Sequence, residues 1–481
     1  MTTSLNANTD PAMTLPFNRI TETSAPPRPA KNPLALIGNT PIVEITKLDG
    51  GLCQLFLKLE GANPGGSIKD RPALTMIEAA ERDGRLKPGG VIVEATAGNT
   101  GLGLALVSAA KGYRLTLVIP DKMSREKIFH LRAMGAEVVL TRSDVGKGHP
   151  EYYQDKAERL AAATPGAIFI NQFANPANPL AHQTGTGPEI FAQLEGKVDA
   201  IVCGVGSGGT LTGLSRFFAE RSPTTEFILA DPAGSILKDV VENRPPGAAG
   251  SWLVEGIGED FVPLNADLSR VSRAYAVSDA ESFAAARELL KREGLLVGSS
   301  TGTMLAAALR YAREQTAAKR VVVLSPDGGA KYLSKMFNDY WMEDQGFIQR
   351  PATGDLRDLI GRRHDLGAAV TVAPDDKLQV AYARMKLYDV SQLPVLEDDR
   401  IVGLVDESDL LLAVIENPAR FDEPVSAAMT TNIETIAVDA PIPALRRMFD
   451  KDFVAVVVDG ERFLGLITRI DLLNHLRRRK D

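Results

Sequence analysis

The chain is poor in cysteine, in long apolar runs and in excess positive charge. Its two cysteines, Cys53 and Cys203, lie far apart, which excludes a disulfide framework and any Cys-x-x-Cys metal or redox site, so no metal is expected. No uninterrupted apolar stretch approaches the roughly 18 residues of a membrane span. Acidic residues outnumber basic ones, 61 to 54, so the chain lacks the basic field of a nucleic-acid-coating protein. We therefore expect a protein of a reducing compartment that binds neither membrane nor nucleic acid.

The composition is that of a globular protein. Hydrophobic residues make up 44% and charged residues 24% of the 481 residues, a length that suggests roughly three domains. Residues 1–32 are rich in threonine and proline, and no basic stretch precedes an apolar one as in a secretory signal. We expect a disordered N-terminal tail and a cytoplasmic location.

Residues 33–342 alternate short apolar runs with amphipathic segments. Strands rich in Val, Ile and Leu between helices predict an α/β fold with parallel sheets covered on both faces, and the length predicts two lobes. Residues 343–365 are charged and interrupted by Pro and Gly, and we interpret them as a linker. The expected strands are 91–94, 115–119, 137–140, 200–203, 227–230 and 321–324, and the expected helices are 72–82, 101–111, 124–134, 280–292 and 303–313.

Residues 366–481 contain an internal repeat. Residues 401–411 match residues 463–473 at an offset of 62 (471 − 409), and each half predicts the order strand, helix, strand, strand, helix. Two such small α+β units, at about 366–418 and 424–481, cannot each bury a core alone and should pack together.

Two motifs in the first half could form a site. Residues 63–71 (NPGGSIKDR) place Lys69 at the start of a predicted helix after a loop of small residues, where burial and the helix dipole would lower the pKa of a nucleophilic amine. Taken alone, Lys69 is more simply interpreted as a solvated lysine in a turn. Residues 94–101 (EATAGNTG) offer Thr96, Asn99 and Thr100 beside free main-chain N–H groups, which suits either a carboxylate or phosphate cradle or an ordinary capped turn.

Two later motifs are rich in glycine and hydroxyl groups. Residues 203–213 (CGVGSGGTLTG) can wrap a phosphate with help from Ser207 and Thr210, yet the spacing of their glycines, with Asp231 ending the next strand, also satisfies a dinucleotide fingerprint. A nicotinamide oxidoreductase is therefore an alternative on this motif alone. Residues 297–302 (VGSSTG) form a further hydroxyl-rich turn.

The four motifs in this order resemble those of the fold type II pyridoxal-phosphate enzymes, the family of cysteine synthases and cystathionine β-synthases. The C-terminal repeat resembles a tandem pair of CBS domains, the Bateman module. This resemblance implies pyridoxal 5′-phosphate bound covalently through Lys69, with Asn99 on the ring hydroxyl and Ser300 facing the pyridine nitrogen. The implied cofactor-binding residues are Lys69, Asn99, Gly206, Ser207, Gly208, Gly209, Thr210 and Ser300, and the implied substrate-binding residues are Thr96, Gly98, Asn99, Thr100, Gln172, Glu255 and Gly256.

The resemblance also implies a β-replacement reaction. Residues 254–258 (VEGIG) resemble the cystathionine-synthase version, in which Glu255 could pair with the ammonium of homocysteine, whereas residues 171–173 (NQF) look more like a cysteine synthase and Ala97 departs from the usual serine. We expect L-serine and L-homocysteine to give L-cystathionine and water, with hydrogen sulfide production implied as a further output. A cysteine synthase that uses sulfide with O-acetylserine or serine is the alternative, and a non-catalytic CBS-domain sensor is a third class.

The resemblance implies further ligands and a homodimer or larger homo-oligomer. The CBS signature Gly-h-h-Thr/Ser-x-x-Asp is satisfied by Thr468 and Asp471, whereas Asp406 places an acid at the hydroxyl position of the first repeat. We expect at most one regulatory site, and S-adenosylmethionine, with its cationic sulfonium, fits that site better than ATP. No haem is expected, because residues 1–52 contain neither the Cys nor the His that holds haem in some relatives.

Overall fold

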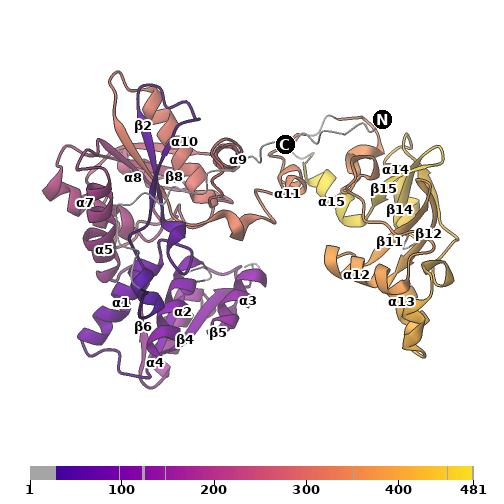
Figure 1. The fold of residues 1–481 in the computed structure, drawn as a ribbon, viewed down its shortest axis with the longest axis horizontal. Helices are drawn as coiled ribbons and strands as arrows, with labels where there is room; N and C mark the ends of the chain where they lie inside the picture. Colours follow the sequence, from indigo (N-terminus) through magenta and orange to yellow (C-terminus); the bar gives the residue numbers. More distant parts are fainter. Residues whose placement is uncertain are drawn as a thin grey trace, which may run out of the picture. The chain divides into compact units, whose positions relative to one another are not determined.

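The computed structural model describes residues 29–96, 98–121, 125–146, 148–349, 352–451 and 453–478. The chain forms two compact units, one ending at Gly328 and one beginning at Gly329 (Figure 1). Within the described ranges, no helix is long and apolar enough to cross a membrane. Most of the predicted N-terminal tail, residues 1–28, lies outside the described residues. So does Ala97, which stands where the family usually has serine.

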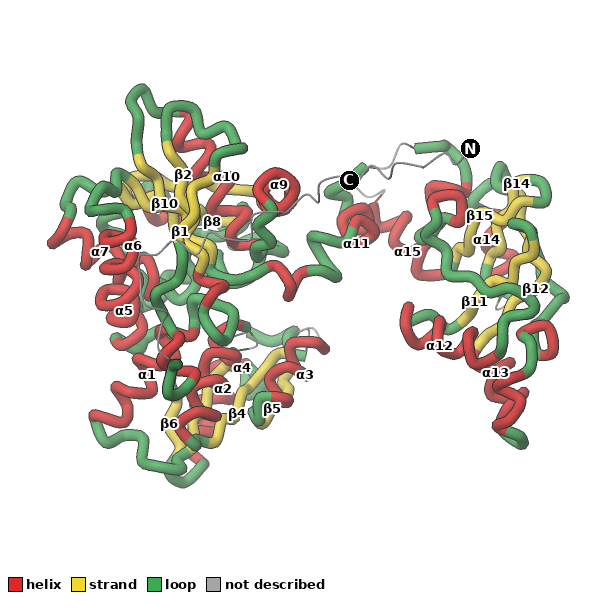
Figure 2. Tube along the Cα trace, in the orientation of Figure 1, coloured by secondary structure: helices red, strands yellow, loops and turns green. Residues whose placement is uncertain are grey.

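The larger lobe of the first unit is built on a six-stranded sheet. Its strands run in the order β1-β2-β10-β7-β8-β9 and are parallel except for β1, an antiparallel edge strand that the sequence pattern did not indicate. The inner strands are almost wholly buried because helices cover the sheet, as Val- and Ile-rich parallel strands require (Figure 2). The strands are β1 (Ile42–Ile45), β2 (Gln54–Leu59), β7 (Ala200–Cys203), β8 (Glu226–Pro232), β9 (Val271–Val277) and β10 (Arg320–Ser325).

The smaller lobe is built on a parallel sheet of order β5-β4-β3-β6. One face packs on α1 and α2, and the other packs on α4. Two lobes with parallel sheets between helices confirm the predicted α/β architecture of this unit. The strands are β3 (Val91–Ala95), β4 (Arg114–Pro120), β5 (Glu137–Thr141) and β6 (Ala167–Phe169), and the helices are α1 (Asp70–Arg82), α2 (Asn99–Lys111), α3 (Arg125–Ala133) and α4 (Tyr153–Ala163).

Helix α10 (Ser299–Arg313) begins four residues earlier than the expected start at Thr303. Gly298 adopts an extended conformation as its N-cap, and the hydroxyls that follow are buried rather than solvated. The hydroxyl of Thr301 is hydrogen-bonded to that of Ser325, and the hydroxyl of Thr303 to that of Ser282. Residues expected to form a turn before the helix therefore form its buried first turn. The other helices of this unit are α5 (Ala177–Ala181), a π-helical turn (His182–Thr186), α6 (Gly187–Gln193), α7 (Gly209–Arg221), α8 (Leu237–Val241) and α9 (Asp279–Glu293).

The second unit contains the two predicted repeats. A bulge interrupts both hairpins at matching places, after Val395 and after Val457, which keeps the offset of 62 (457 − 395). The opening strand of the first repeat is reduced to a single bridge between Val372 and Val395. The elements are α11 (Asp339–Asp344), α12 (Leu378–Tyr388), β11 (Gln392–Glu397), β12 (Arg400–Asp406), α13 (Glu407–Val414), β13 (Thr435–Ala437), α14 (Pro443–Phe449), β14 (Ala455–Asp459), β15 (Arg462–Ile467) and α15 (Arg469–Arg478).

The segment expected to be a linker is partly core. Leu356, Leu359 and Ile360 are buried and pack with the apolar residues of the second repeat, and the N–H of Leu356 bonds to the carbonyl of Val438. Residues 329–342, which we expected in the catalytic domain, belong by their contacts to the second unit. The three apolar residues are hidden in the sequence by the charged residues between them, which is why the segment resembled a linker.

Candidate active site

Lys69 lies at the N-cap of α1, at the carboxyl end of the loop that follows β2. Its side chain is half-buried, and desolvation lowers the pKa of its amine below 10.5, against the opposing effects of Cys203 and Glu259. The main chain of the loop is tied to the large sheet, because Ser67 bridges Asp327 just beyond β10. The amine therefore lies near Cys203, the last residue of β7, and is more easily deprotonated than a surface lysine.

The loop after β3 and the segment after β6 meet at the start of α2. The Thr100 hydroxyl donates to Oε1 of Gln172 over 2.7 Å, and the N–H of Gly98 donates to the Thr96 hydroxyl. Glu94, buried at the end of β3, accepts hydrogen bonds from the N–H groups of Ala95 and Gln172. These contacts bring together four residues that the resemblance assigned to a substrate carboxylate, Thr96, Gly98, Thr100 and Gln172.

Asn99, the first residue of α2, faces a carboxylate from the other lobe. Its side-chain amide donates to Oδ2 of Asp327 over 2.8 Å. Asp327 is buried and follows β10 by two residues. The pair fixes the orientation of the Asn99 amide relative to the Lys69 loop, since Asp327 contacts both segments.

The glycine-rich loop between β7 and α7 leaves no room for side chains at Gly204, Gly206, Gly208 and Gly209. Gly208 has φ +84°, and a Cβ there would lie 2.6 Å from the main chain of Ala266. A Cβ on Gly209 would meet the Asn178 side chain, whose amide donates to the Ser207 hydroxyl. Only glycine permits this conformation, which leaves the N–H groups at the start of α7 beside the hydroxyls of Ser207 and Thr210.

Residues 254–259 lie directly on this loop. The N–H of Gly258 donates to the carbonyl of Val205 over 2.8 Å, and a Cβ on Gly206 would lie 2.6 Å from the carbonyl oxygen of Gly256. The N–H of Glu255 donates to the hydroxyl of Ser299 at the start of α10. Glu255 is half-buried and Gly256 exposed, while the neighbouring Ser300 is buried in the first turn of α10.

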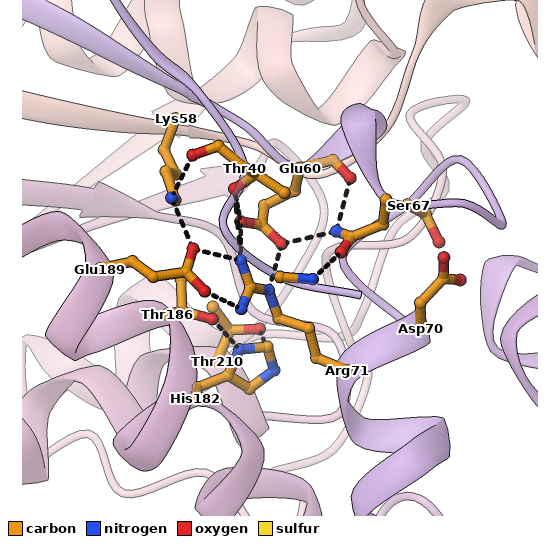
Figure 3. A network of polar contacts seen from close by, with 12 residues as sticks. Thr40, Lys58, Glu60, Ser67, Asp70, Arg71, His182, Thr186, Glu189 and Thr210 are labelled. Atoms are coloured by element: carbon orange, nitrogen blue, oxygen red, sulfur yellow. Dashed lines mark hydrogen bonds and ion pairs between the residues drawn. The ribbon is translucent and has the colours of Figure 1, made fainter. Parts of the chain in front are cut away.

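A buried ionic network joins α1 to α6 and β2 (Figure 3). The Arg71 guanidinium makes paired hydrogen bonds of 2.6–2.8 Å with the carboxylates of Glu60 and Glu189, and Lys58 bonds to Glu189 over 2.8 Å. Burial raises the pKa of Glu189, but its bonds to Arg71 and Lys58 outweigh burial and lower the pKa to about 2. Because Arg71 follows Lys69 by two residues, the network fixes the start of the helix that carries the amine.

A second buried contact supports the glycine-rich loop. His182 lies between Thr186 and Thr210, with its ring nitrogens 3.0 and 3.2 Å from their hydroxyls (Figure 3). Burial, together with the charges of Lys69 and Arg71, holds the pKa of His182 well below 6.5. The imidazole is therefore neutral and orients the Thr210 hydroxyl without adding charge.

These residues fit pyridoxal phosphate. A desolvated amine stands near a loop of N–H and hydroxyl donors that is closed to side chains, as covalent attachment and phosphate binding require. The rival dinucleotide interpretation loses its acidic residue, because the Asp231 carboxylate is buried and accepts a hydrogen bond from the N–H of Lys238 in α8. The sequence analysis assigned no role to four residues of the site, Glu94, Asp327, His182 and Glu259. The sequence marks them only as polar residues near the end of an apolar strand or inside a glycine-containing segment.

The second unit has a cavity of about 220 Å³ between its repeats. Gln392 and Pro394 of the first repeat and Phe463 of the second line it, as do Thr468 and Asp471. The Asp471 carboxylate accepts hydrogen bonds from the N–H and the hydroxyl of Thr468. Arg362, on the segment before the first repeat, adds a positive side chain to the lining.

Comparisons with known proteins agree with this arrangement. Residues 34–327 match the family model "Pyridoxal-phosphate dependent enzyme", and residues 364–416 and 425–478 match "CBS domain". Cystathionine beta-synthase of Apis mellifera is 36% identical, over 92% of this chain and 90% of its own length, and that of Mus musculus is 37% identical, over 93% and 86%.

A solved structure extends the comparison to the fold. A hydrogen sulfide-producing enzyme from Fusobacterium nucleatum aligns with a TM-score of 0.59 and 40% identity, covering 63% of this chain and all of that one. The chain therefore belongs to the pyridoxal-phosphate-dependent enzymes, in the cystathionine β-synthase family whose catalytic domain is followed by two CBS domains.

Proposed function

We propose that the chain condenses L-serine with L-homocysteine to give L-cystathionine and water. The observation that carries the proposal is the convergence of the desolvated Lys69 amine, the glycine-rich loop at Gly206–Thr210 and the Thr100–Gln172 pair at the carboxyl ends of the strands. Relatives named cystathionine beta-synthase over more than nine-tenths of this chain support the choice of substrates.

Pyridoxal phosphate, when bound, supplies the electron sink that weakens the bonds at the donor's Cα. The residues that would hold it are Lys69 at the reactive carbon, Gly206, Ser207, Gly208, Gly209 and Thr210 at the phosphate, Asn99 at the ring hydroxyl and Ser300 at the ring nitrogen. A hydroxyl at Ser300 supplies no negative charge to that nitrogen, which favours departure of a β-substituent over transamination.

The chain's own residues would then bind the donor and move its protons. Thr96, Gly98, Asn99, Thr100 and Gln172 would hold the donor carboxylate. The lowered pKa of Lys69 leaves a fraction of its amine neutral, so it can take the Cα proton and give it to the departing β-hydroxyl.

The choice of acceptor is tested at Glu255. Replacing Glu255 with Gln removes a charge-assisted hydrogen bond to the acceptor ammonium, worth roughly 1.5–3 kcal/mol, or on the order of tenfold to a hundredfold. We expect this loss in cystathionine formation from homocysteine and a smaller one in cysteine formation from sulfide, which has no ammonium. Equal losses with both acceptors would make Glu255 structural and favour the cysteine-synthase alternative, which is also tested by comparing O-acetylserine with serine as donor.

We also propose that the cavity between the CBS repeats binds S-adenosylmethionine. Thr468 and Asp471 line it, and Asp471 would accept from ribose hydroxyls. Calorimetric titration should show heat and an activity change in the wild type, neither in Asp471→Ala, and both in Asp409→Ala of the first repeat. Because Arg362 adds positive charge, AMP is the competing ligand, and a response to AMP alone would overturn the choice of S-adenosylmethionine. No response to either would leave the module as an assembly element.

We propose that no haem is bound. The proposal is based on the absence of Cys and His from residues 1–52, because these are the residue types that hold haem in some relatives. A Soret band in protein purified with haem supplied would contradict this.

A further inference from the structure

Glu259 is fixed beside the glycine-rich loop by its main chain. Its N–H donates to the hydroxyl of Ser235, and its carbonyl accepts hydrogen bonds from the same hydroxyl and from the N–H of Ile236, each over 3.1 Å. The half-buried side chain lies over the loop, with Oε1 at 3.9 Å from the position of a Cβ on Gly206. The carboxyl group thus lies beside the glycine-rich loop.

The charged and titratable groups that face Glu259 come from several elements. Lys69 from the α1 loop interacts electrostatically with its carboxyl group, as do Asp231 at the end of β8 and the neighbouring Asp260. Tyr152 and Tyr153, at the start of α4 in the other lobe, also interact with its charge. The carboxyl group is therefore close enough to the catalytic amine, and to groups of the other lobe, to interact with their charges.

This environment raises the pKa of the Glu259 carboxyl group, so its carboxylate is a stronger base than that of an ordinary glutamate. Burial, followed by repulsion from Asp260, raises the pKa of Glu259 to about 8, although Lys69 opposes the rise. A value near that of an ordinary thiol permits proton exchange in either direction, which is the property of an efficient general base.

The proposed reaction, on which this inference rests, leaves one proton to be accounted for. Lys69 gives the donor's Cα proton to the hydroxyl that departs as water, so it has none left to return to Cα. The acceptor thiol must lose a proton as its sulfur forms the C–S bond. Moving that proton to Lys69 balances the reaction.

We propose that Glu259 takes the proton from the acceptor thiol and passes it to Lys69. The sulfur lone pair forms the bond to the donor Cβ while the S–H electrons stay on sulfur and the proton moves to the Glu259 carboxylate. The proton then moves to the Lys69 amine, which delivers it to Cα, and Glu259 is again ionised. Glu259 is thus a catalytic residue of the second half of the reaction only.

The test uses the full-length, cofactor-loaded chain and a series of thiol acceptors that differ in thiol pKa. None of them carries an ammonium group, so the proposed contact with Glu255 does not affect the comparison. In Glu259→Gln, thiols that are protonated at the assay pH should react roughly a hundredfold more slowly. A thiol already ionised at that pH has no proton to give, so Lys69 takes its proton from solvent in both proteins, and this thiol should react at nearly the wild-type rate. The matched control, Glu220→Gln, removes an exposed glutamate in the last turn of α7 and should keep wild-type rates. An equal loss for ionised and protonated thiols in Glu259→Gln would overturn the proposal.

Two measurements without turnover separate this proposal from the proposed function. Adding serine without a thiol should change the visible spectrum of wild type and Glu259→Gln alike, because Glu259 has no part in the first half-reaction. A protonated-carboxyl infrared component should disappear with a midpoint near pH 8 in the wild type. Glu259→Gln should lack this component and keep the one near pH 7 that belongs to Glu94. A carboxyl group already ionised at pH 6 would overturn the role of Glu259, whereas a wild type that does not respond to serine would overturn the proposed function.

Discussion

The carboxylate of Glu94 holds the main chain of Gln172 in place: Oε2 of Glu94 accepts a 3.1 Å hydrogen bond from the Gln172 N–H. Its Oε1 accepts from Ala95 over 2.8 Å, at the start of the loop that carries Thr96 and Thr100. One buried side chain therefore sets the spacing between the two segments proposed to bind the donor carboxylate. Burial raises the pKa of this carboxyl group to about 7, although the three N–H groups it accepts from lower it.

Replacing Glu94 with Gln should weaken donor binding. The amide can accept through its oxygen only, so one N–H group loses its partner, at a cost of about 1–3 kcal/mol. We expect the KM for serine to rise on the order of tenfold while kcat with saturating serine changes less. Steady-state kinetics at varied serine checks this, and an unchanged KM with a lowered kcat would contradict the positioning role.

The phosphate role of the glycine-rich loop is best tested at Thr210. Gly208→Asp should strip the cofactor by placing a negative charge in the loop, but any Cβ there meets Ala266 at 2.6 Å, so that variant also distorts the chain. Thr210→Val removes only the hydroxyl that His182 contacts and keeps the side-chain shape. We expect the dissociation constant for pyridoxal phosphate, measured by equilibrium dialysis, to rise on the order of tenfold. An unchanged constant would refute the role of this hydroxyl.

The Arg71–Glu189 pair should make the fold sensitive to acid. The pKa of Glu189 is lowered from 4.5 to about 2, so its stabilising effect is present above pH 4.5 and is lost as the pH falls from 4.5 towards 2. The free energy of unfolding should therefore be larger for the wild type than for Glu189→Gln at pH 6, and the difference should shrink between pH 5 and pH 3. Denaturant unfolding at each pH gives this difference, and one that does not change with pH would show that the charge of Glu189 does not stabilise the fold.

The parallel sheets and the order of the motifs could be predicted because buried strands leave continuous apolar runs and motifs follow strand ends. The contacts between the two lobes could not be predicted from the sequence. Asp327 lies 228 residues from Asn99, and Glu189 lies 118 residues from Arg71, so no local pattern links them. Glu259 reads in sequence as a surface acid, because what makes it a base is burial against a loop more than 50 residues earlier.

The central claim is that Lys69 carries the cofactor, and the visible absorbance of the purified protein with pyridoxal phosphate tests it most directly. Wild type and the matched control Lys87→Ala, which changes an exposed lysine, should both be coloured. Lys69→Ala should be folded by circular dichroism, colourless after dialysis and inactive. Retention of the wild-type absorbance band by dialysed Lys69→Ala would contradict the account.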